Sequence, residues 1–439
     1  MSRPNDLSAY WLPFTPNRNF KREPRLLTRA EGMYFYDESG RALLDTCSGL
    51  WCVNAGHGRK EIVDAIRKSA GELDFAPTFQ FGHPAAFKLA ERIAALAPEG
   101  LDHVFFVNSG SEAADTALKI ARAYAQKSGQ GSRFRLIGRE RAYHGVNFGG
   151  ISAGGIANNR KPYGPLLPGT DDHLPLPYDK AKMAFTRGDP DGGAVFADAL
   201  ESLVALHGAD TIAAVIVEPF AGSAGVFAPP TDYLKRLRQL CDKHGILLIF
   251  DEVITGFGRV GHAFAAERYG VTPDIITFAK GVTNGAVPLG GVIVSNRIHD
   301  AFMGGPDHAI EFFHGHTYSG HPLACAAGLA TLDLYRDEQL FARALKMERV
   351  LEEAVHALKN APFVTDIRNC GMAAGIDIEP DANAPGRRGL EVLARAFHDQ
   401  DMVVRVGADT LALAPAFIVS EDEITRMVEG VRAVLMQLS

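Results

Sequence analysis

Cysteine is scarce in this 439-residue sequence: there are five, an odd number, and no two of them form a CxxC pair. They are Cys47, Cys52, Cys241, Cys325 and Cys370. This usage favours reduced thiols over a disulfide framework. Long apolar runs are also lacking, because the longest are the size of a strand and a membrane helix needs about 20 apolar residues. The first twenty residues do not contain the apolar core of a signal peptide. We therefore expect a cytoplasmic protein that does not enter the membrane.

An excess of positive charge is lacking as well. The formal net charge is -7 and no basic block stands out, which gives no support for nucleic-acid binding. Neither a GxGxxG nor a Walker A sequence occurs, so a dinucleotide or ATP is disfavoured. His314, His316 and His321 lie close together in "HGHTYSGHP", but no nearby carboxylate or cysteine completes a metal site. We expect no bound metal ion.

What is present is a regular alternation of short apolar runs with helical patterns. The predicted strands are "HVFFV" (103–107), "TIAAVIV" (211–217), "ILLIF" (246–250), "DIITF" (274–278) and "GGVIV" (290–294). Between two of them, residues 231–245 repeat apolar side chains at helical spacing, with Thr231 as the predicted N-cap and Gly245 as the stop. Strands that alternate with helices indicate an α/β fold with a mostly parallel sheet flanked by helices.

The pattern changes after His321. Long amphipathic helices follow, such as "DEQLFARALKMERVLEEAVHALKN", and then the short strands "MVVRV" and "TLALAP". We predict a large domain over residues 61–320 and a smaller α+β domain over residues 321–439. Residues 1–60 have little periodicity before the hairpin pattern "MYFYDESGRALLD", and we expect them to pack with the smaller domain.

Two charged residues follow neighbouring predicted strands. Asp251 comes directly after "ILLIF", and Lys280 follows "DIITF" closely. Residues just past the carboxyl ends of neighbouring parallel strands line one crevice. One interpretation is a buried ion pair, because a buried carboxylate needs a cationic or hydrogen-bonding partner. The other is that Lys280 holds the aldehyde cofactor pyridoxal phosphate (PLP) as an imine, while Asp251 keeps the ring nitrogen of the cofactor protonated.

A further motif suits a phosphate group. "HVFFVNSGSEAADTALKIARAY" contains a strand, a Ser-Gly-Ser turn and a helix, so the first N–H groups of the helix and the hydroxyls of Ser109 and Ser111 would cradle a phosphate. Ser109 and Glu112 equally suit a capping box without any ligand. Tyr143 in "RAYHGVNFGG" suits either stacking on a flat ring or packing in a core. Glu218 ends another buried strand, and we interpret it as a supporting carboxylate of the site or as half of a structural ion pair.

Together these motifs carry a resemblance that covers almost the whole chain. "NSGSEAADTALKIARAY", "YHGVNFGG", "VIVEP", "LLIFDEVITGFGR", "FAKGVTNGAVPLGG" and "HTYSGHPLACAAGLA" follow the pattern and order of the class III, or ω-, aminotransferases. Members of this family are PLP enzymes of fold type I. Within the family the sequence is most similar to the ω-amino acid:pyruvate group, including β-alanine–pyruvate transaminases, through "WLPFTPNRNFKREPR", "CSGLWCVNAGHG", "FQFGHP", "SAGGIANNRKPYG" and "VRVGADTLALAP".

The resemblance implies roles for individual residues. Lys280 would form the imine with PLP and Asp251 would pair with its ring nitrogen, so these two are the expected catalytic residues. Cofactor binding would further involve Gly110, Ser111, Tyr143, Glu218, Val253 and Thr317, with Tyr143 and Val253 on the two faces of the ring. Substrate binding would involve Trp51, Arg405, Phe14, Phe79 and Tyr143, and Phe81 is a further candidate.

Thr317 and Arg405 have particular consequences. In this family the residue that matches Thr317 reaches the phosphate in the neighbouring subunit, which implies a homodimer at minimum with its active sites at the subunit interface, and some members are tetramers. Arg405 would bind the carboxylate of the substrate. Ala286 departs from the family pattern, because many members carry an aromatic residue there, and the smaller side chain should open the pocket.

We expect the enzyme to move an amino group from an ω-amino acid or primary amine, with β-alanine favoured, to pyruvate by a ping-pong mechanism. The products would be an aldehyde or ketone, which is malonate semialdehyde for β-alanine, and L-alanine. Alternatives within the PLP enzymes are transaminases of 4-aminobutyrate, taurine or a polyamine, and an aminomutase. Alternatives outside them are a binding protein that kept the fold and lost the chemistry, and a nicotinamide dehydrogenase.

Overall fold

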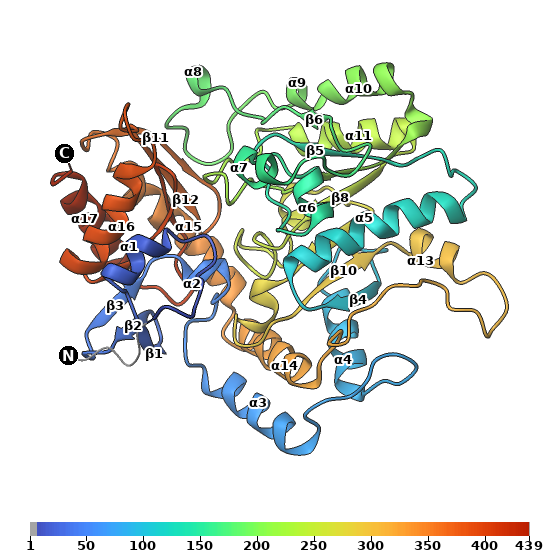
Figure 1. Cartoon of the computed structure of the whole chain (residues 1–439), viewed down its shortest axis with the longest axis horizontal. Coiled ribbons are helices and arrows are strands. Elements are labelled where there is room, and N and C mark those ends of the chain that lie inside the picture. The colour runs from blue at the N-terminus through green and yellow to red at the C-terminus, as the bar shows by residue number, and fades with distance from the viewer. Residues whose placement is uncertain (1–6, 439) are drawn as a thin grey trace.

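The computed structural model describes residues 7–438 and arranges them around three β-sheets (Figure 1). The largest sheet has seven strands in the order β4-β10-β9-β8-β7-β5-β6. Their bounds are His103–Val107 (β4), Arg135–Arg139 (β5), His173–Leu174 (β6), Ile212–Val217 (β7), Leu247–Asp251 (β8), Ile275–Phe278 (β9) and Gly290–Val294 (β10). The strands β5 to β9 pair in parallel, whereas β10 pairs antiparallel with both β9 and β4. The predicted α/β class with a mostly parallel sheet is confirmed.

The five strands predicted for this sheet lie within one residue of their predicted ends. Every residue of β7 and β8 is buried, as expected for parallel strands with helices on both faces. Ile249 of β8 packs in one apolar cluster with α5 (Gly110–Lys127), whereas Leu248 and Phe250 pack in another with α11 (Tyr233–His244). Because successive side chains of a strand point to opposite faces, α5 and α11 cover opposite faces of the sheet.

The predicted N-cap of α11 is wrong. The helix begins at Tyr233, and its N-cap is Asp232, which has a φ of 67° and makes no side-chain cap bond. Thr231 is held by a neighbouring loop, since its N–H donates to the carbonyl of Pro190 at 2.7 Å and its own carbonyl accepts from Gly193 at 2.8 Å. The helix does end at Gly245, which is left-handed with a φ of 63°.

Further helices and 3-10 turns accompany the sheet. The helices are α3 (Lys60–Glu72), α4 (Pro84–Ala94), α6 (Phe148–Ala153), α7 (Ala157–Arg160), α8 (Lys180–Met183), α9 (Ala194–Ala197), α10 (Ala199–His207), α12 (Ala265–Tyr269), α13 (Asn296–Phe302) and α14 (Pro322–Asp337). The 3-10 turns are η1 (Lys161–Tyr163), η2 (Ala209–Thr211) and η3 (Lys280–Thr283). Among residues 7–438, no helix combines the length and the apolar character that a membrane crossing requires.

The two ends of the chain meet on the left of Figure 1, where blue N-terminal elements lie beside red C-terminal ones. One sheet there has the order β1-β2-β3-β13, with bounds Leu27–Glu31, Tyr34–Asp37, Ala42–Asp45 and Met402–Val403. The other has the order β11-β12-β15-β14, with bounds Val364–Asn369, Ala374–Ile378, Thr410–Leu413 and Arg405–Gly407. The accompanying helices are α1 (Asn17–Arg22), α2 (Ser48–Trp51), α15 (Leu340–His356), α16 (Arg387–Asp399) and α17 (Glu421–Leu435).

Pairing across this half joins distant parts of the chain. The predicted hairpin is confirmed, since β2 and β3 pair antiparallel, and β3 continues the sheet by pairing in parallel with β13. Leu44 thereby lies opposite Met402. The limits of the domains, at 1–60, 61–320 and 321–439, stay a prediction, and residues 1–6 lie outside the described residues.

Candidate active site

Lys280 and Asp251 come from neighbouring parallel strands. Asp251 is the last residue of β8 and pairs in register with Thr277 of β9, which stands three residues before Lys280. Lys280 is half-buried and begins η3 with a left-handed φ of 51°. Burial is the main cause that lowers the pKa of the Lys280 amine, and nearby Asp251 acts in the opposite direction. A lysine with a lowered pKa is a good amine nucleophile at neutral pH.

Three groups hold the buried carboxylate of Asp251. The hydroxyl of Thr277 and the N–H of Val253 donate to Oδ1 at 3.1 and 3.2 Å, and Nδ1 of His144 lies 2.7 Å from Oδ2. Nε2 of His144 is buried and has no hydrogen-bond partner among the described residues. Asp251 is therefore held in one orientation near Lys280, and His144 is a supporting residue that the sequence alone did not indicate.

Glu218 follows β7 and lies beside the same groups. The N–H groups of Tyr143 and Gly222 donate to its two carboxylate oxygens, each at 3.0 Å, and Nη2 of Arg139 lies 3.8 Å from Oε1. Burial is the main cause that raises the pKa of Glu218, and Arg139 is the main opposing influence. Glu218 thus holds the main chain at Tyr143 and takes part in a buried ion pair with Arg139, while its role as a supporting carboxylate of the site stays a prediction.

The first turn of α5 provides hydrogen-bond donors. Ser109 is its N-cap, and the Ser109 hydroxyl accepts from the N–H of Glu112 at 3.2 Å. The Glu112 carboxylate accepts from the N–H of Asn108 at 2.7 Å instead of returning to Ser109, so only half of the predicted capping box forms. The first N–H groups of a helix have no acceptor within it, and those of Gly110 and Ser111 are at this position. Together with the helix dipole, such groups favour an anion.

One cavity of about 190 Å³ collects these groups. Seven predicted residues line it: Gly110, Ser111, Tyr143, Glu218, Asp251, Val253 and Lys280. They match the parts of PLP, because the cavity offers an amine for the aldehyde, a carboxylate for the ring nitrogen, a helix start for the phosphate and side chains for the ring faces. These residues would hold the cofactor.

The other predicted residues do not line this cavity. Trp51 is buried, and it packs in a cluster with Phe220 and Ile254, which do line the cavity. Phe79 and Phe81, on the connection between α3 and α4, are 57% and 71% exposed. Substrate contacts of these three residues stay predictions.

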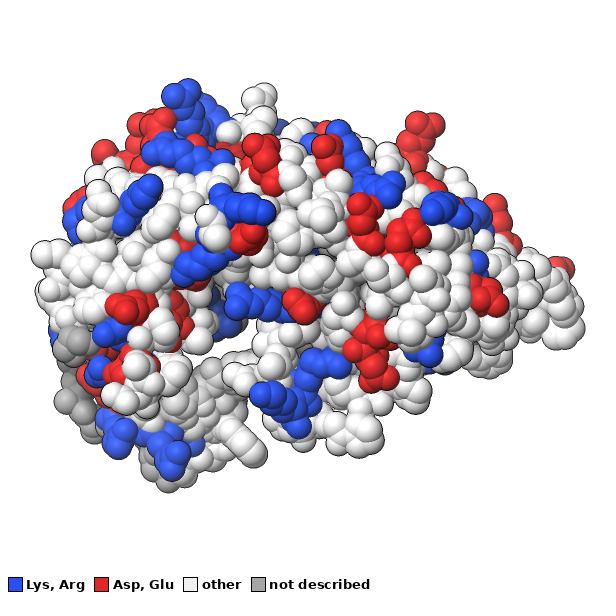
Figure 2. Space-filling view, turned by 90° about the horizontal axis from the view of Figure 1, so that it is seen from above, with Lys and Arg blue, Asp and Glu red and all other residues white. Residues whose placement is uncertain are grey.

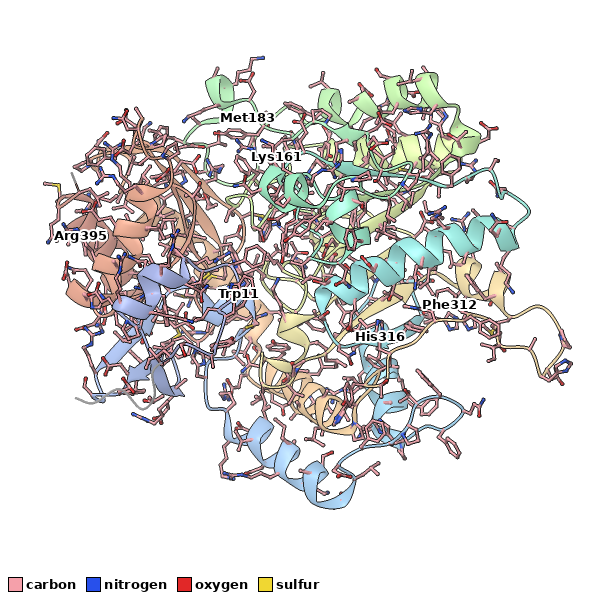
Figure 3. The ribbon with its side chains drawn as sticks, viewed as in Figure 1. Trp11, Lys161, Met183, Phe312, His316 and Arg395 are labelled. Atoms are coloured by element: carbon pink, nitrogen blue, oxygen red, sulfur yellow. The ribbon has the colours of Figure 1, made fainter. Side chains whose placement is uncertain are left out.

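Thr317 is exposed on the loop between α13 and α14. This loop runs beside α5 and β4, where Figure 3 labels Phe312 and His316 on it. The ring of Phe312 lies 5.9 Å from that of Phe105 in β4, and His314 Nε2 lies 2.8 Å from the Thr116 hydroxyl in α5. The loop is therefore held against the large sheet while Thr317 points to the surface.

Arg405 lies on β14 and is not among the residues that line this cavity. Its side chain is exposed and forms no ion pair with any residue in the range 7–438. Burial is the main cause that raises the pKa of the Tyr143 phenol, and the charge of Arg405 acts in the opposite direction. Arg405 pairs in register with Ala412 of β15, which packs in one cluster with Trp51. Arg405 and the 71% exposed Phe14 both line a second, larger chamber of about 790 Å³.

Comparison with known proteins is consistent with this geometry. A family model described as aminotransferase class-III matches residues 16–435. The chain is 58% identical over 434 residues to an omega-aminotransferase of Caulobacter vibrioides, which covers 99% of this chain and 98% of that protein. It is 51% identical over 429 residues to a beta-alanine–pyruvate aminotransferase of Pseudomonas aeruginosa, with 97% and 95% covered. An amine transaminase from an uncultivated Pseudomonas species, solved in its PLP-bound form, has a TM-score of 0.88 at 35% identity and covers 98% of this chain and 99% of that one.

The chain belongs to the class III aminotransferases. The predicted family, fold type and aminotransferase activity are thereby confirmed. The family is PLP-dependent, and the solved relative contains this cofactor. The roles of the individual residues stay predictions, and they are developed below as a proposal.

Proposed function

We propose that this aminotransferase binds PLP and transfers the amino group of β-alanine, or of another ω-amino acid or primary amine, to pyruvate. The products are malonate semialdehyde, when β-alanine is the donor, and L-alanine. The observation that carries the proposal is that Lys280 and Asp251 meet in one cavity at the start of α5. The choice of substrates is supported by the relative that is named beta-alanine–pyruvate aminotransferase.

When bound, PLP supplies an aldehyde that captures the amino group and a protonated ring that accepts negative charge from the reacting carbon. Lys280 would hold the aldehyde carbon in the resting enzyme. Burial lowers the pKa of its amine, which increases the fraction of Nζ in the neutral form. As a neutral amine, Nζ removes the proton from the substrate carbon that bears the nitrogen.

Asp251 faces the ring nitrogen in this proposal. Its carboxylate cannot turn freely, because Thr277 and His144 occupy its two oxygens. A charge that is already oriented before reaction costs no reorganisation when the ring develops its own charge. Gly110 and Ser111 would bind the phosphate, and Tyr143 and Val253 would hold the ring.

Arg405 binds the carboxylate of the substrate. Its guanidinium is free of ion pairs within residues 7–438, and its strand neighbour Ala412 packs with Phe220 and Ile254 of the cavity lining. A guanidinium binds a carboxylate in two-point fashion, and the long side chain allows movement between carboxylates at different distances from the reacting carbon. This is what β-alanine and pyruvate require, since their carboxylates lie at different distances from that carbon.

The active unit we propose is a cytoplasmic homodimer. The exposed positions of Thr317, Phe79 and Phe81, away from the cavity of their own chain, are compatible with contacts to a second copy. All five cysteines are free thiols, which suits a reducing compartment. Sedimentation equilibrium tests the assembly: a dimer or tetramer is expected, and a catalytically active monomer would contradict it.

The visible spectrum of the PLP-loaded protein tests the chemistry. We expect the yellow band to bleach on addition of β-alanine alone and to return on addition of pyruvate. Lys280→Met is the matched control, since it removes the amine that forms the coloured imine and should show neither change. Borohydride should fix the cofactor to Lys280, as peptide mapping would report. Bleaching by putrescine, taurine or 4-aminobutyrate but not by β-alanine would change the donor, and turnover without any keto acid would indicate an aminomutase.

A further inference from the structure

A second chamber, of about 790 Å³, has Arg405 in its lining. Arg405 pairs in register with Ala412 of β15, and Ala412 packs in one cluster with Phe220 and Ile254 of the cavity lining, so Arg405 links the chamber to the catalytic cavity. Residues of the N-terminal segment, of α16 and of β14 line the chamber, and so does Asn158 of α7. In Figure 2 the surface is hollowed on the left, the side on which the N-terminal segment lies, and Lys and Arg atoms lie along the hollow.

The size of the chamber exceeds what a short substrate needs. Pockets of roughly 300–1,000 Å³ enclose ligands much larger than β-alanine or pyruvate. Most of the chamber wall is apolar, and it includes Leu12, Phe20, Leu390, Leu393, Phe397 and Val406. An apolar space of this size beside the catalytic cavity suits a methylene chain, because each buried methylene strengthens binding.

The charged residues of the chamber all have the same sign. Arg25, Arg387 and Arg405 line it, and no described Asp or Glu does. Arg387 is neutralised by Asp381 at 2.7 Å, whereas Arg25 and Arg405 form no ion pair with residues 7–438. Arg25 is half-buried and lies over the ring of Phe20 at 5.3 Å.

Burial is the main cause that lowers the pKa of Arg25, and the charge of Glu23 acts in the opposite direction. A partly buried cation without a counterion is unfavourable, and an anionic ligand would relieve this cost.

We propose that the chamber binds the tail of long, unbranched ω-amino acids and that Arg25 holds their distal carboxylate, while Arg405 holds the carboxylate of short donors. This inference rests on the proposed function, because the amino end of the donor must reach Lys280. It defines two donor classes for one site, separated by the place at which the carboxylate binds.

A binding experiment tests the chamber without requiring turnover. Calorimetry would measure the affinity of the PLP-loaded protein for straight-chain dicarboxylates of increasing length, each compared with the monocarboxylate of the same length. Beyond a threshold length we expect the dicarboxylate to bind about tenfold more tightly, since its two ends reach Arg405 and Arg25. Arg25→Gln should abolish that difference and Arg25→Lys should keep most of it. Arg29→Gln is the matched control, because Arg29 is exposed on β1, pairs with Glu31 and does not line the chamber.

Kinetics provide the second measurement. The ratio of kcat/KM for a long ω-amino acid to that for β-alanine should fall about tenfold in Arg25→Gln and stay constant in Arg29→Gln. Equal loss for both donors in Arg25→Gln would overturn the proposal, because Arg25 would then act through the fold. Dicarboxylates that bind no more tightly than monocarboxylates at any length would overturn it as well. If β-alanine and pyruvate fail to react while the dicarboxylate effect persists, the proposed function fails and the chamber assignment stands.

Discussion

We predict that the substitution Arg259→Met lowers the free energy of unfolding. The side chain is fully buried, and its guanidinium donates to the carbonyls of Met372 and Pro415 at 3.0 and 2.7 Å. It also donates to Asn54 Oδ1 at 2.6 Å and to the Ser48 hydroxyl at 3.0 Å. Arg259, which follows β8 by eight residues, thus binds both the N-terminal segment and the C-terminal part of the chain. Burial is the main cause that lowers the pKa of Arg259 to about 10.

The size of the effect follows from these contacts. Methionine would leave three buried acceptors unpaired, since the Ser48 hydroxyl still donates to the carbonyl of Ala414. At about 2 kcal/mol for each unpaired group, this costs roughly 6 kcal/mol. Removal of the buried charge offsets about 3 kcal/mol, because the fall of the pKa from 12.5 to about 10 corresponds to about 1.4 kcal/mol per pH unit. We expect a net loss of about 3 kcal/mol in the free energy of unfolding.

Urea unfolding at a fixed protein concentration measures this loss. Arg343→Met is the matched control, because Arg343 also donates to main-chain carbonyls, those of Phe417 and Val419, each at 2.7 Å, but from an exposed position where water can replace it. We expect that control to change stability by about 0.5 kcal/mol or less. If Arg259→Met unfolds at the same urea concentration as the wild type, the bonds of Arg259 do not outweigh the burial of its charge, and the reasoning is refuted.

Three further predictions concern the active-site region. In Gly110→Ala, the added Cβ would lie 2.8 Å from Cγ1 of Val253, so the cavity wall must move. The dissociation constant of PLP should therefore rise about tenfold, as measured by fluorescence titration. An unchanged affinity would contradict the proposed phosphate site at the start of α5. Burial is the main cause that raises the pKa of Glu252 to about 7, so the folded state binds the proton of Glu252 more tightly than the unfolded state does. The free energy of unfolding should therefore fall by about 3 kcal/mol between pH 4.5 and pH 7. Glu252→Gln should lack that slope in urea unfolding, and equal slopes would contradict the assignment. Cys52 is the one cysteine among the five that is not fully buried, so a thiol reagent should modify a single thiol in the native protein and all five after unfolding. The native reaction should be slow, because burial raises the pKa of Cys52. Several thiols that react fast in the native protein would contradict the burial of the other four cysteines.

The meeting of Asp251 and Lys280 in one cavity was predictable because one local pattern determines where both residues lie. The strands β8 and β9 are buried on both faces, and each apolar run ends close to a charged residue that the sheet places at its carboxyl edge. Parallel neighbours in a sheet then bring Asp251 and Lys280 together without information from elsewhere in the chain. The same logic failed for the cap of α11, because Thr231 makes its hydrogen bonds with residues of a distant loop.

His144 and Arg259 escaped prediction because their partners are remote. His144 and Asp251 are 107 residues apart in the sequence, and Arg259 and Pro415 are 156 apart. Nothing in the neighbourhood of either residue indicates that its side chain turns inward. An arginine that binds four uncharged groups leaves no oppositely charged partner in the sequence from which the contact could be inferred.

The difference between local and remote contacts also separates the residues proposed for the chemistry from those proposed for the choice of substrate. Lys280 and Asp251 are positioned by one sheet, whereas Arg405, Phe14 and Arg25 meet only where the two ends of the chain fold against each other. The walls of the chamber can therefore change without displacing Asp251 and Lys280, since the register of β8 and β9 does not depend on them. Substitutions at Arg25 should accordingly alter which donors bind while leaving the coloured imine at Lys280 intact. A substitution at Arg25 that bleached the imine would show that the two regions are coupled after all.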